Sequence, residues 1–167
     1  MNTSLKQAAR EAYALAPSDV AVLETLAFTH PSWDAPVYLV KNREDLDLTL
    51  ETGETVTFTA CAFRMALPAA GENGLQEIQI AVDNVDRVAS DALLTVATSK
   101  QPVQVVFRPY LSNDTTAPQM DPPLVLFLTD ATITSVEVVC RATFADVLNR
   151  SFPSQYYVRR RFPALGA

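Results

Sequence analysis

The stretch LQEIQIAVDNVDRVASDALL, Leu75–Leu94, decides the fold because the spacing of its apolar residues changes midway. In the first half, apolar residues occupy every second position: Ile78, Ile80 and Val82. This is the period of a half-buried strand. In the second half they recur at steps of three and four: Val85, Val88, Ala92 and Val96. That spacing predicts a short amphipathic helix that packs back over the sheet.

Polar residues mark the corner between this strand and this helix. Asp83 or Asn84 can cap the first amides of the helix, and Asp86 lies near the positive end of its dipole. The same three residues could suggest calcium binding, but the twelve-residue loop with its distal glutamate is missing. We therefore interpret them as capping residues.

The flanking sequence predicts further strands on both sides of this stretch. Alternating or continuous apolar runs cover residues 20–30, 37–40, 46–50, 55–67, 101–108, 124–128 and 133–143. Gly53 lies in the turn between two of these runs and can adopt a positive φ, which predicts a hairpin. Residues 124–128 are apolar on both faces, as in a strand that is covered on both sides, and Asp130-Ala131 predicts a turn. Thr3–Leu15 predicts a helix, capped by Thr3 or Ser4.

Composition indicates one globular domain. The 167 residues are 49% hydrophobic and 19% charged, values typical of a packed core. No apolar run approaches the roughly 20 residues that span a bilayer, and the first residues lack the apolar core of a secretion signal. We expect synthesis in a cytoplasm and no membrane partner. The net charge of −6 argues against nucleic acid as the main partner.

Residue types that carry chemistry are sparse. Cys61 and Cys140 lie in apolar runs, which predicts buried thiols, and the lone His30 lacks the spacing of a catalytic base. The carboxylate pairs Asp45-Asp47 and Glu51-Glu54 fall on the polar side of a predicted hairpin, as expected for a solvated surface. We predict no catalytic, metal or cofactor site.

The segment from Phe144 to Ala167 has neither a strand nor a helix period, yet it is rich in aromatic residues and arginine. This composition is typical of an extended arm whose aromatic side chains fill pockets on another surface. Its arginines could contact DNA phosphates or the carboxylates of a neighbouring subunit, and the acidic balance of the chain favours the neighbour. The residues predicted to make this contact are Phe152, Tyr156, Tyr157, Arg159, Arg160, Arg161 and Phe162.

Together these patterns predict a mainly β protein of roughly eight strands, an antiparallel sandwich or barrel-like domain with two short helices. We expect an N-terminal helix in residues 1–17, a β-rich body in residues 18–145 and an extended arm in residues 146–167.

Several segments resemble a known family. They are LETLAFTHPSW (Leu23–Trp33), PVYLVKN (Pro36–Asn42), FTACAFRMALP (Phe58–Pro68), IQIAVDNVDR (Ile78–Arg87), VQVVFRPYL (Val103–Leu111) and DVLNRSFPSQYYVRRRFPAL (Asp146–Leu165). In this order they resemble a family of minor tail proteins of long-tailed bacteriophages and prophages. Leu75–Leu111 is also similar to the β-rich domain of tail-tip hub proteins.

The resemblance implies a structural protein of the virion, not an enzyme. It implies a ring-forming hub or adaptor at the tail tip, or baseplate, which joins the distal tail tube to the central tip and fibre-bearing proteins. The implied partners are other copies of the chain, with threefold symmetry favoured over sixfold, and the distal tail protein, central tip protein and tape measure. DNA would only pass through the lumen.

Two alternatives remain open at this stage: a tail assembly chaperone absent from mature virions, and a cell-wall hydrolase that uses His30. Some larger hub proteins carry a cysteine-rich iron–sulfur segment. With only Cys61 and Cys140 available, that cluster is not carried over.

Overall fold

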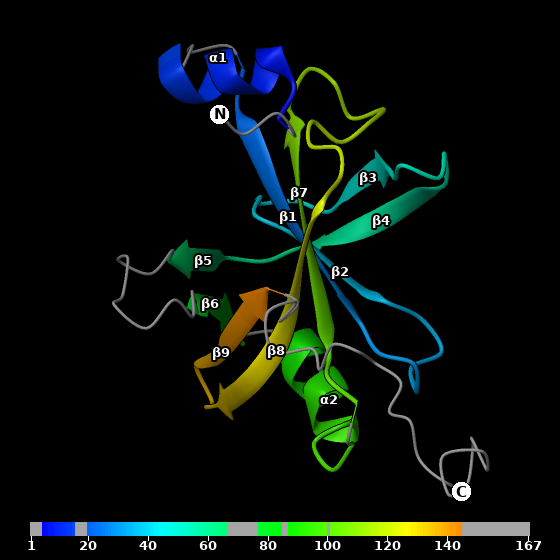
Figure 1. Ribbon diagram of the computed structural model, residues 1–167, viewed down its shortest axis with the longest axis vertical. Coiled ribbons are helices and arrows are strands. Elements are labelled where there is room, and N and C mark those ends of the chain that lie inside the picture. The colour runs from blue at the N-terminus through cyan, green and yellow to red at the C-terminus, as the bar shows by residue number, and fades with distance from the viewer. Residues whose placement is uncertain (1–4, 16–19, 67–76, 85–86, 100, 145–167) are drawn as a thin grey trace, which may run out of the picture.

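The computed structural model describes residues 5–15, 20–66, 77–84, 87–99 and 101–144. This part of the chain forms two helices and nine strands (Figure 1). They are α1 (Gln7–Leu15), β1 (Val22–Thr29), β2 (Val37–Val40), β3 (Leu46–Thr49), β4 (Thr55–Ala60), β5 (Phe63–Ala66), β6 (Glu77–Asp83), α2 (Val88–Thr95), β7 (Gln104–Leu111), β8 (Leu124–Ile133) and β9 (Glu137–Phe144). The prediction of a mainly β fold is confirmed.

All strands belong to one sheet, with the order β3-β4-β2-β1-β7-β8-β9-β6-β5. Every pair is antiparallel except β2 and β4, which run parallel through Leu39–Thr59 and Val40–Ala60. The long central pair β1–β7 is in register from Val22–Leu111 to Thr29–Gln104. The sheet is therefore built of neighbouring antiparallel strands, with one parallel contact near one end.

That parallel contact closes the sheet on itself. β4 pairs with β2, and β5, which follows β4 after only two linking residues, pairs with β6 at the other end of the strand order. The two linking residues continue the hydrogen bonding on both sides: Cys61 N donates to Val40 O at 2.9 Å, and Asp83 N donates to Ala62 O at 2.8 Å. The β-rich body is thus a barrel, and of the two predicted architectures the barrel is the one observed.

The inside of the barrel holds the main hydrophobic core. It draws buried side chains from β1, β2 and β5–β9, including Leu26, Phe28, Ile80, Val105 and Leu126. Helix α2 closes one end, because its buried residues Ala89 and Leu93 belong to the same cluster. Figure 1 shows α2 at one end of the molecule and α1 at the opposite end.

A second, smaller core lies outside the barrel. The β3–β4 hairpin packs Leu48 and Phe58 against Val40 and Tyr110, which point outward from β2 and β7. The Tyr110 hydroxyl donates to the carbonyl of Thr49 at 2.9 Å, and burial raises the pKa of Tyr110 to about 12. The hairpin turn contains Gly53 at φ 83°, as predicted.

An ion pair fixes the hairpin turn to the barrel wall. The Arg108 Nε donates to both carboxylate oxygens of Glu51, at 2.8 and 3.0 Å. The Arg108 side chain is only 13% exposed, and its buried Nη1 finds no acceptor within the described part of the chain. The guanidinium therefore depends on Glu51 for compensation of its charge.

The corner after β6 differs from the prediction. Helix α2 begins at Val88, four residues after Asn84, and its N-cap Arg87 is left-handed (φ 57°) with no side-chain cap. Asn84 is buried, and its amide nitrogen instead donates to the Thr134 carbonyl at 2.7 Å. The prediction that Asp83 or Asn84 caps α2 is therefore wrong. The side-chain amide of Asn84 is instead hydrogen-bonded to the connection between β8 and β9. Asp86 lies outside the described residues.

The predicted face of α2 is confirmed only at Val96, and Val85 lies outside the described residues. Ala89, Leu93 and Val96 face the core, whereas Val88 is 39% exposed. This face still has steps of four and three, so two stripes were compatible with the sequence and tertiary packing selected one.

Two further boundaries differ. The Asp130-Ala131 pair lies within β8, after a register shift between Leu128 and Asp130, and the turn comes at residues 134–136. In residues 124–128 only Leu126 is buried, so this strand is covered mainly on its inner face. Helix α1 starts at Gln7, and Leu5 pairs instead with Met120. The proposed caps Thr3 and Ser4 lie outside the described residues.

We predict that Glu51→Gln lowers the free energy of unfolding by about 1–2 kcal/mol, because a mostly buried guanidinium loses its counter-charge. Glu54→Gln, an exposed carboxylate on the same turn, is the matched control and should change stability by less than about 0.5 kcal/mol. Urea denaturation measures both. Equal effects would show that the Arg108–Glu51 pair does not anchor the hairpin.

Alkaline pH should weaken the second core. Because the pKa of Tyr110 is raised in the folded state, its contribution to stability is complete below pH 10 and is lost as the pH rises from 10 towards 12. Tyr110→Phe should cost about 1 kcal/mol at neutral pH by removing one hydrogen bond. It should also make stability fall less steeply across this pH range than in the unmodified chain. If the free energy of unfolding fell equally steeply with pH in the Tyr110→Phe chain and the unmodified chain, burial of the phenol would be contradicted.

Candidate functional site

Large apolar side chains that remain exposed are gathered at the two ends of the barrel. Among the described residues, Tyr13 and Leu15 lie on α1, and Phe144 lines the same hollow as Tyr13. Val88 and Leu94 lie on α2, and Val136 lies in the β8–β9 turn, where its carbonyl accepts from Asn84 N. Leu15 and Val136 are 77% and 71% exposed. Single exposed apolar residues are ordinary, but two groups at opposite ends indicate surfaces suited to protein contacts.

The α1 end contains an apolar hollow of about 690 Å³, which we call the mouth hollow. Its wall comes from six strands of the barrel: Glu24, Met65, Ile78, Phe107, Leu124 and Phe144. Tyr13 of α1 and the segment from Met120 to Pro123 complete the rim. Among the described residues, α2 packs against the core at the other end, whereas this end carries the hollow.

Glu24 is the one charged residue in the lining of the mouth hollow. Its carboxylate accepts from Lys41 Nζ at 2.8 Å, and the two side chains are 31% and 49% exposed. Burial, and secondarily the negative charge of Glu24, raises the pKa of Tyr13. The hollow therefore offers apolar walls, a phenol and one carboxylate, which suits an aromatic or aliphatic side chain beside a cation.

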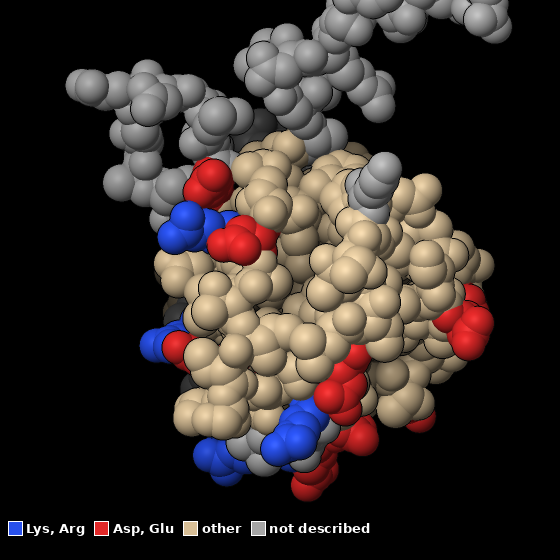
Figure 2. All heavy atoms as spheres, turned by 90° about the horizontal axis from the view of Figure 1, so that it is seen from below, with Lys and Arg blue, Asp and Glu red and all other residues tan. Residues whose placement is uncertain are grey.

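The α2 end presents a broad face with few charged side chains. Figure 2 views the molecule from this side, and the Lys, Arg, Asp and Glu side chains visible there lie mainly around its periphery. A shallow depression of about 450 Å³ runs between α2 and β8, with Ala97, Pro102 and Ala131 in its lining. This face suits a flat protein contact more than a small ligand, which usually occupies a deeper pocket.

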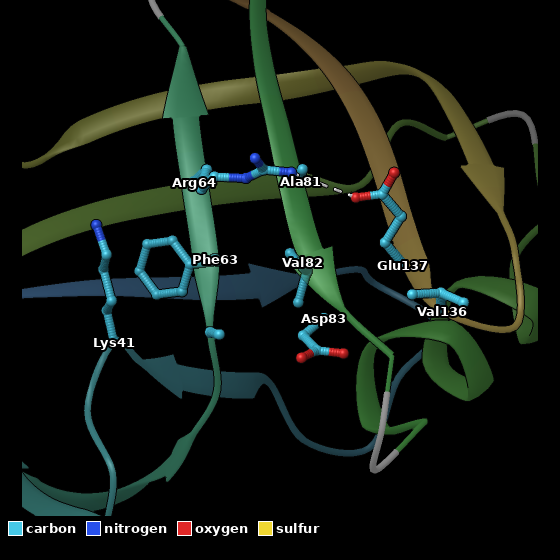
Figure 3. Close-up of a pocket in the computed structure, with 9 residues that line it drawn as sticks. Lys41, Phe63, Arg64, Ala81, Val82, Asp83, Val136 and Glu137 are labelled. Carbon is cyan, nitrogen blue, oxygen red and sulfur yellow. Dashed lines mark ion pairs between the residues drawn. The ribbon is translucent and has the colours of Figure 1, made fainter.

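A third depression, of about 370 Å³, follows the seam where the barrel closes (Figure 3). Lys41 lies over the Phe63 ring, with its nitrogen 6.0 Å from the ring centroid. Arg64 and Glu137 form an exposed ion pair at 3.6 Å across β5, β6 and β9. These contacts join neighbouring strands and have no arrangement of an acid, a base and a nucleophile.

His30 has a structural environment. It is 6% exposed and lies at the end of β1. Its Nδ1 accepts from Ser32 N at 3.1 Å, so Nε2 carries the proton and lies 3.1 Å from Ser99 Oγ and 3.2 Å from the Gln101 carbonyl. The ring thereby ties the β1 end to the connection between α2 and β7.

The other candidate residues also have structural partners. Asp45 accepts from Ala60 N, and Asp47 accepts from the Thr57 hydroxyl, both at 2.7 Å. Cys140 is fully buried, and burial raises the pKa of its thiol to about 12, so it stays protonated at neutral pH. Cys61 is half-buried at the barrel seam, with its sulfur 3.5 Å from the Asp83 carbonyl.

Within the described ranges, no group of three or more His, Cys, Asp or Glu residues is arranged to hold a metal ion. No helix in these ranges is long and apolar enough to cross a bilayer. The seven residues predicted to contact a neighbouring subunit, Phe152, Tyr156, Tyr157, Arg159, Arg160, Arg161 and Phe162, lie outside the described residues. Sequence reasoning missed the mouth hollow, because its lining residues are far apart along the chain.

Comparison with protein families gives one match. A family model described as a domain of unknown function, DUF1833, matches residues 8–157. The matched range runs from α1 through the whole barrel and includes the first residues after β9. A search of curated proteins found no match.

We predict that His30→Ala lowers the free energy of unfolding by about 1–3 kcal/mol, because it leaves buried polar partners unpaired. Ser99→Ala, which removes one of these partners and keeps the ring, should cost less. Thermal or urea denaturation of the purified chain measures both effects. A His30→Ala chain of unchanged stability that abolished infectivity while tails remained intact would instead favour the hydrolase alternative.

Proposed function

The chain belongs to the DUF1833 family, and we propose that it is a structural component of a bacteriophage tail tip. In this proposal it forms a ring as a hub or adaptor, between the distal tail tube and the central tip and fibre-bearing proteins. Its partners are further copies of itself, in threefold rather than sixfold symmetry, and the neighbouring distal tail, central tip and tape-measure proteins. The virion tail tip is its final location, after synthesis in the host cytoplasm.

The placement of the exposed apolar side chains carries this proposal. A subunit stacked between two neighbours along a tube needs a contact surface at each end, and exposed apolar side chains lie on α1 and α2, the helices at opposite ends of the molecule. The wall between these ends is a hydrogen-bonded sheet that closes on itself. The resemblance of segments such as Ile78–Arg87 to minor tail proteins supports the same role.

Charge is also divided unevenly along the chain. Residues 145–167 contain four arginines and one aspartate, a net charge of +3, whereas residues 1–144 contain nine basic and eighteen acidic residues, a net charge of −9. Opposite charges on two parts of one chain favour contacts between copies, because the basic segment of one copy meets the acidic body of another. The acidic body would also let DNA pass through a lumen without binding.

Removal of residues 155–167 should prevent assembly of the ring while the barrel stays folded. The full chain and the truncated chain are compared by light scattering for mass, by negative-stain imaging for ring symmetry and by circular dichroism for folding. A truncated chain that still enters tails would contradict a role of this segment in assembly.

Mass spectrometry of purified virions distinguishes a tail component from an assembly chaperone. We expect the chain to be present in the mature particle in a copy number that matches its ring symmetry. Its absence from otherwise complete particles would contradict the tail-tip role and favour the chaperone.

A further inference from the structure

We propose that the mouth hollow of one copy is the binding site for the segment 152–162 of a neighbouring copy. This inference rests on the proposed ring, and it identifies the surface on which the predicted arm binds. The aromatic side chains of the segment would occupy the apolar floor, and one of its arginines would pair with Glu24.

The floor of the hollow fits an aromatic side chain. Ile78 and Phe107 are at most 8% exposed and form an apolar base, and Met65 and Met120 line it with flexible side chains that adapt to different shapes. A volume of about 690 Å³ lies within the range of roughly 300–1,000 Å³ that is typical of apolar ligand pockets in proteins. At the rim, Tyr13 is 48% exposed and Phe144 is 40% exposed.

The chemistry of the segment matches that of the hollow. Residues 152–162 read FPSQYYVRRRF, in which aromatic residues stand directly beside three arginines. The hollow places a carboxylate, Glu24, at the border of an apolar floor. The Glu24 carboxylate already accepts a hydrogen bond from Lys41. An arginine of the segment can donate a further charge-assisted hydrogen bond to it, at a site that is partly shielded from water.

The position of the last described residue gives the segment access to such a site. Phe144 is itself part of the rim, and 23 residues follow it. Only residues 145–151 separate Phe144 from the segment, and the eight steps from Phe144 to Phe152 span about 26–29 Å when fully extended. An arm of this reach can leave the rim of one copy and enter the hollow of a copy that lies beside it. Arms exchanged around a ring link every copy to its neighbour, whereas an arm in its own hollow would add no contact between copies.

Cysteine cross-linking tests which copy supplies the segment. In a Cys61→Ser, Cys140→Ala background, one chain carries Tyr13→Cys at the hollow rim, and a second chain carries Gln155→Cys, which spares the aromatic residues and arginines. When the two chains are mixed and oxidised, we expect a disulfide-linked heterodimer. Leu15→Cys is the matched control, because Leu15 lies on the same helix and is more exposed but does not line the hollow.

Equal cross-linking from Leu15→Cys, or none from Tyr13→Cys, would overturn the proposal. So would a chain carrying both Tyr13→Cys and Gln155→Cys that forms the disulfide only within a monomer. Mass spectrometry of virions that carry the unmodified chain tests the tail-tip role separately from the arm site. A chain present in a virion ring but lacking the cross-link would contradict the arm site alone, and a chain absent from virions would contradict the tail-tip role.

Charge variants test the proposed pairing with Glu24. Glu24→Gln should weaken self-association of the full chain by about tenfold, the effect of losing one charge-assisted hydrogen bond. Lys41→Gln breaks the same intramolecular ion pair but keeps the carboxylate, so association should stay equal or strengthen. Equal weakening by both variants, measured by sedimentation, would show that only the Lys41–Glu24 pair matters and would overturn the pairing.

Discussion

The closure of the sheet at Cys61 and Ala62 is the constraint on which the rest of the structure depends. A single run of chain pairs with β2 before this point and with β6 after it, so strands from opposite ends of the sheet become neighbours. Two hydrogen bonds cross the junction, from Cys61 N to the Val40 carbonyl and from Asp83 N to the Ala62 carbonyl, and they link the two halves of the ladder. Because the sheet closes, its inward side chains can form one continuous core without a second sheet to cover them.

Closure also determines which surfaces remain for contacts. A closed wall leaves few unpaired strand edges, which would otherwise join other chains indiscriminately. Within the described residues, β3 and β5 are the strands paired on one side only, and in β3 Thr49 N donates to the Thr115 carbonyl. Contacts of large area are therefore left to the two ends, where α2 closes one and the mouth hollow opens the other. This arrangement supports the proposed role as a subunit stacked along a tail axis.

Much of the fold was predictable from sequence because strand alternation is a local signal. The hairpin around Gly53 and the inward set Val103, Val105 and Phe107 were predicted correctly, since each depends on neighbouring residues alone. The cap of α2 was wrong because Asn84 bonds with Thr134, fifty residues away. The seam and the mouth hollow were missed because both join residues that are far apart along the chain. Six separate strands contribute to the hollow alone. The role of the aromatic-arginine segment as a contact region stays a prediction, because the segment lies outside the described residues.

Hydrogen exchange tests most directly whether this barrel makes its contacts through its ends. The amides of the isolated chain are compared with those of the assembled ring or tail. If the ends are the contact surfaces, protection should increase in α1, around Met120–Leu124 and in α2 with the β8–β9 turn, while the barrel strands exchange as before. Increased protection confined to β3 or to the β5–β6 seam, with both ends unchanged, would contradict contact through the ends.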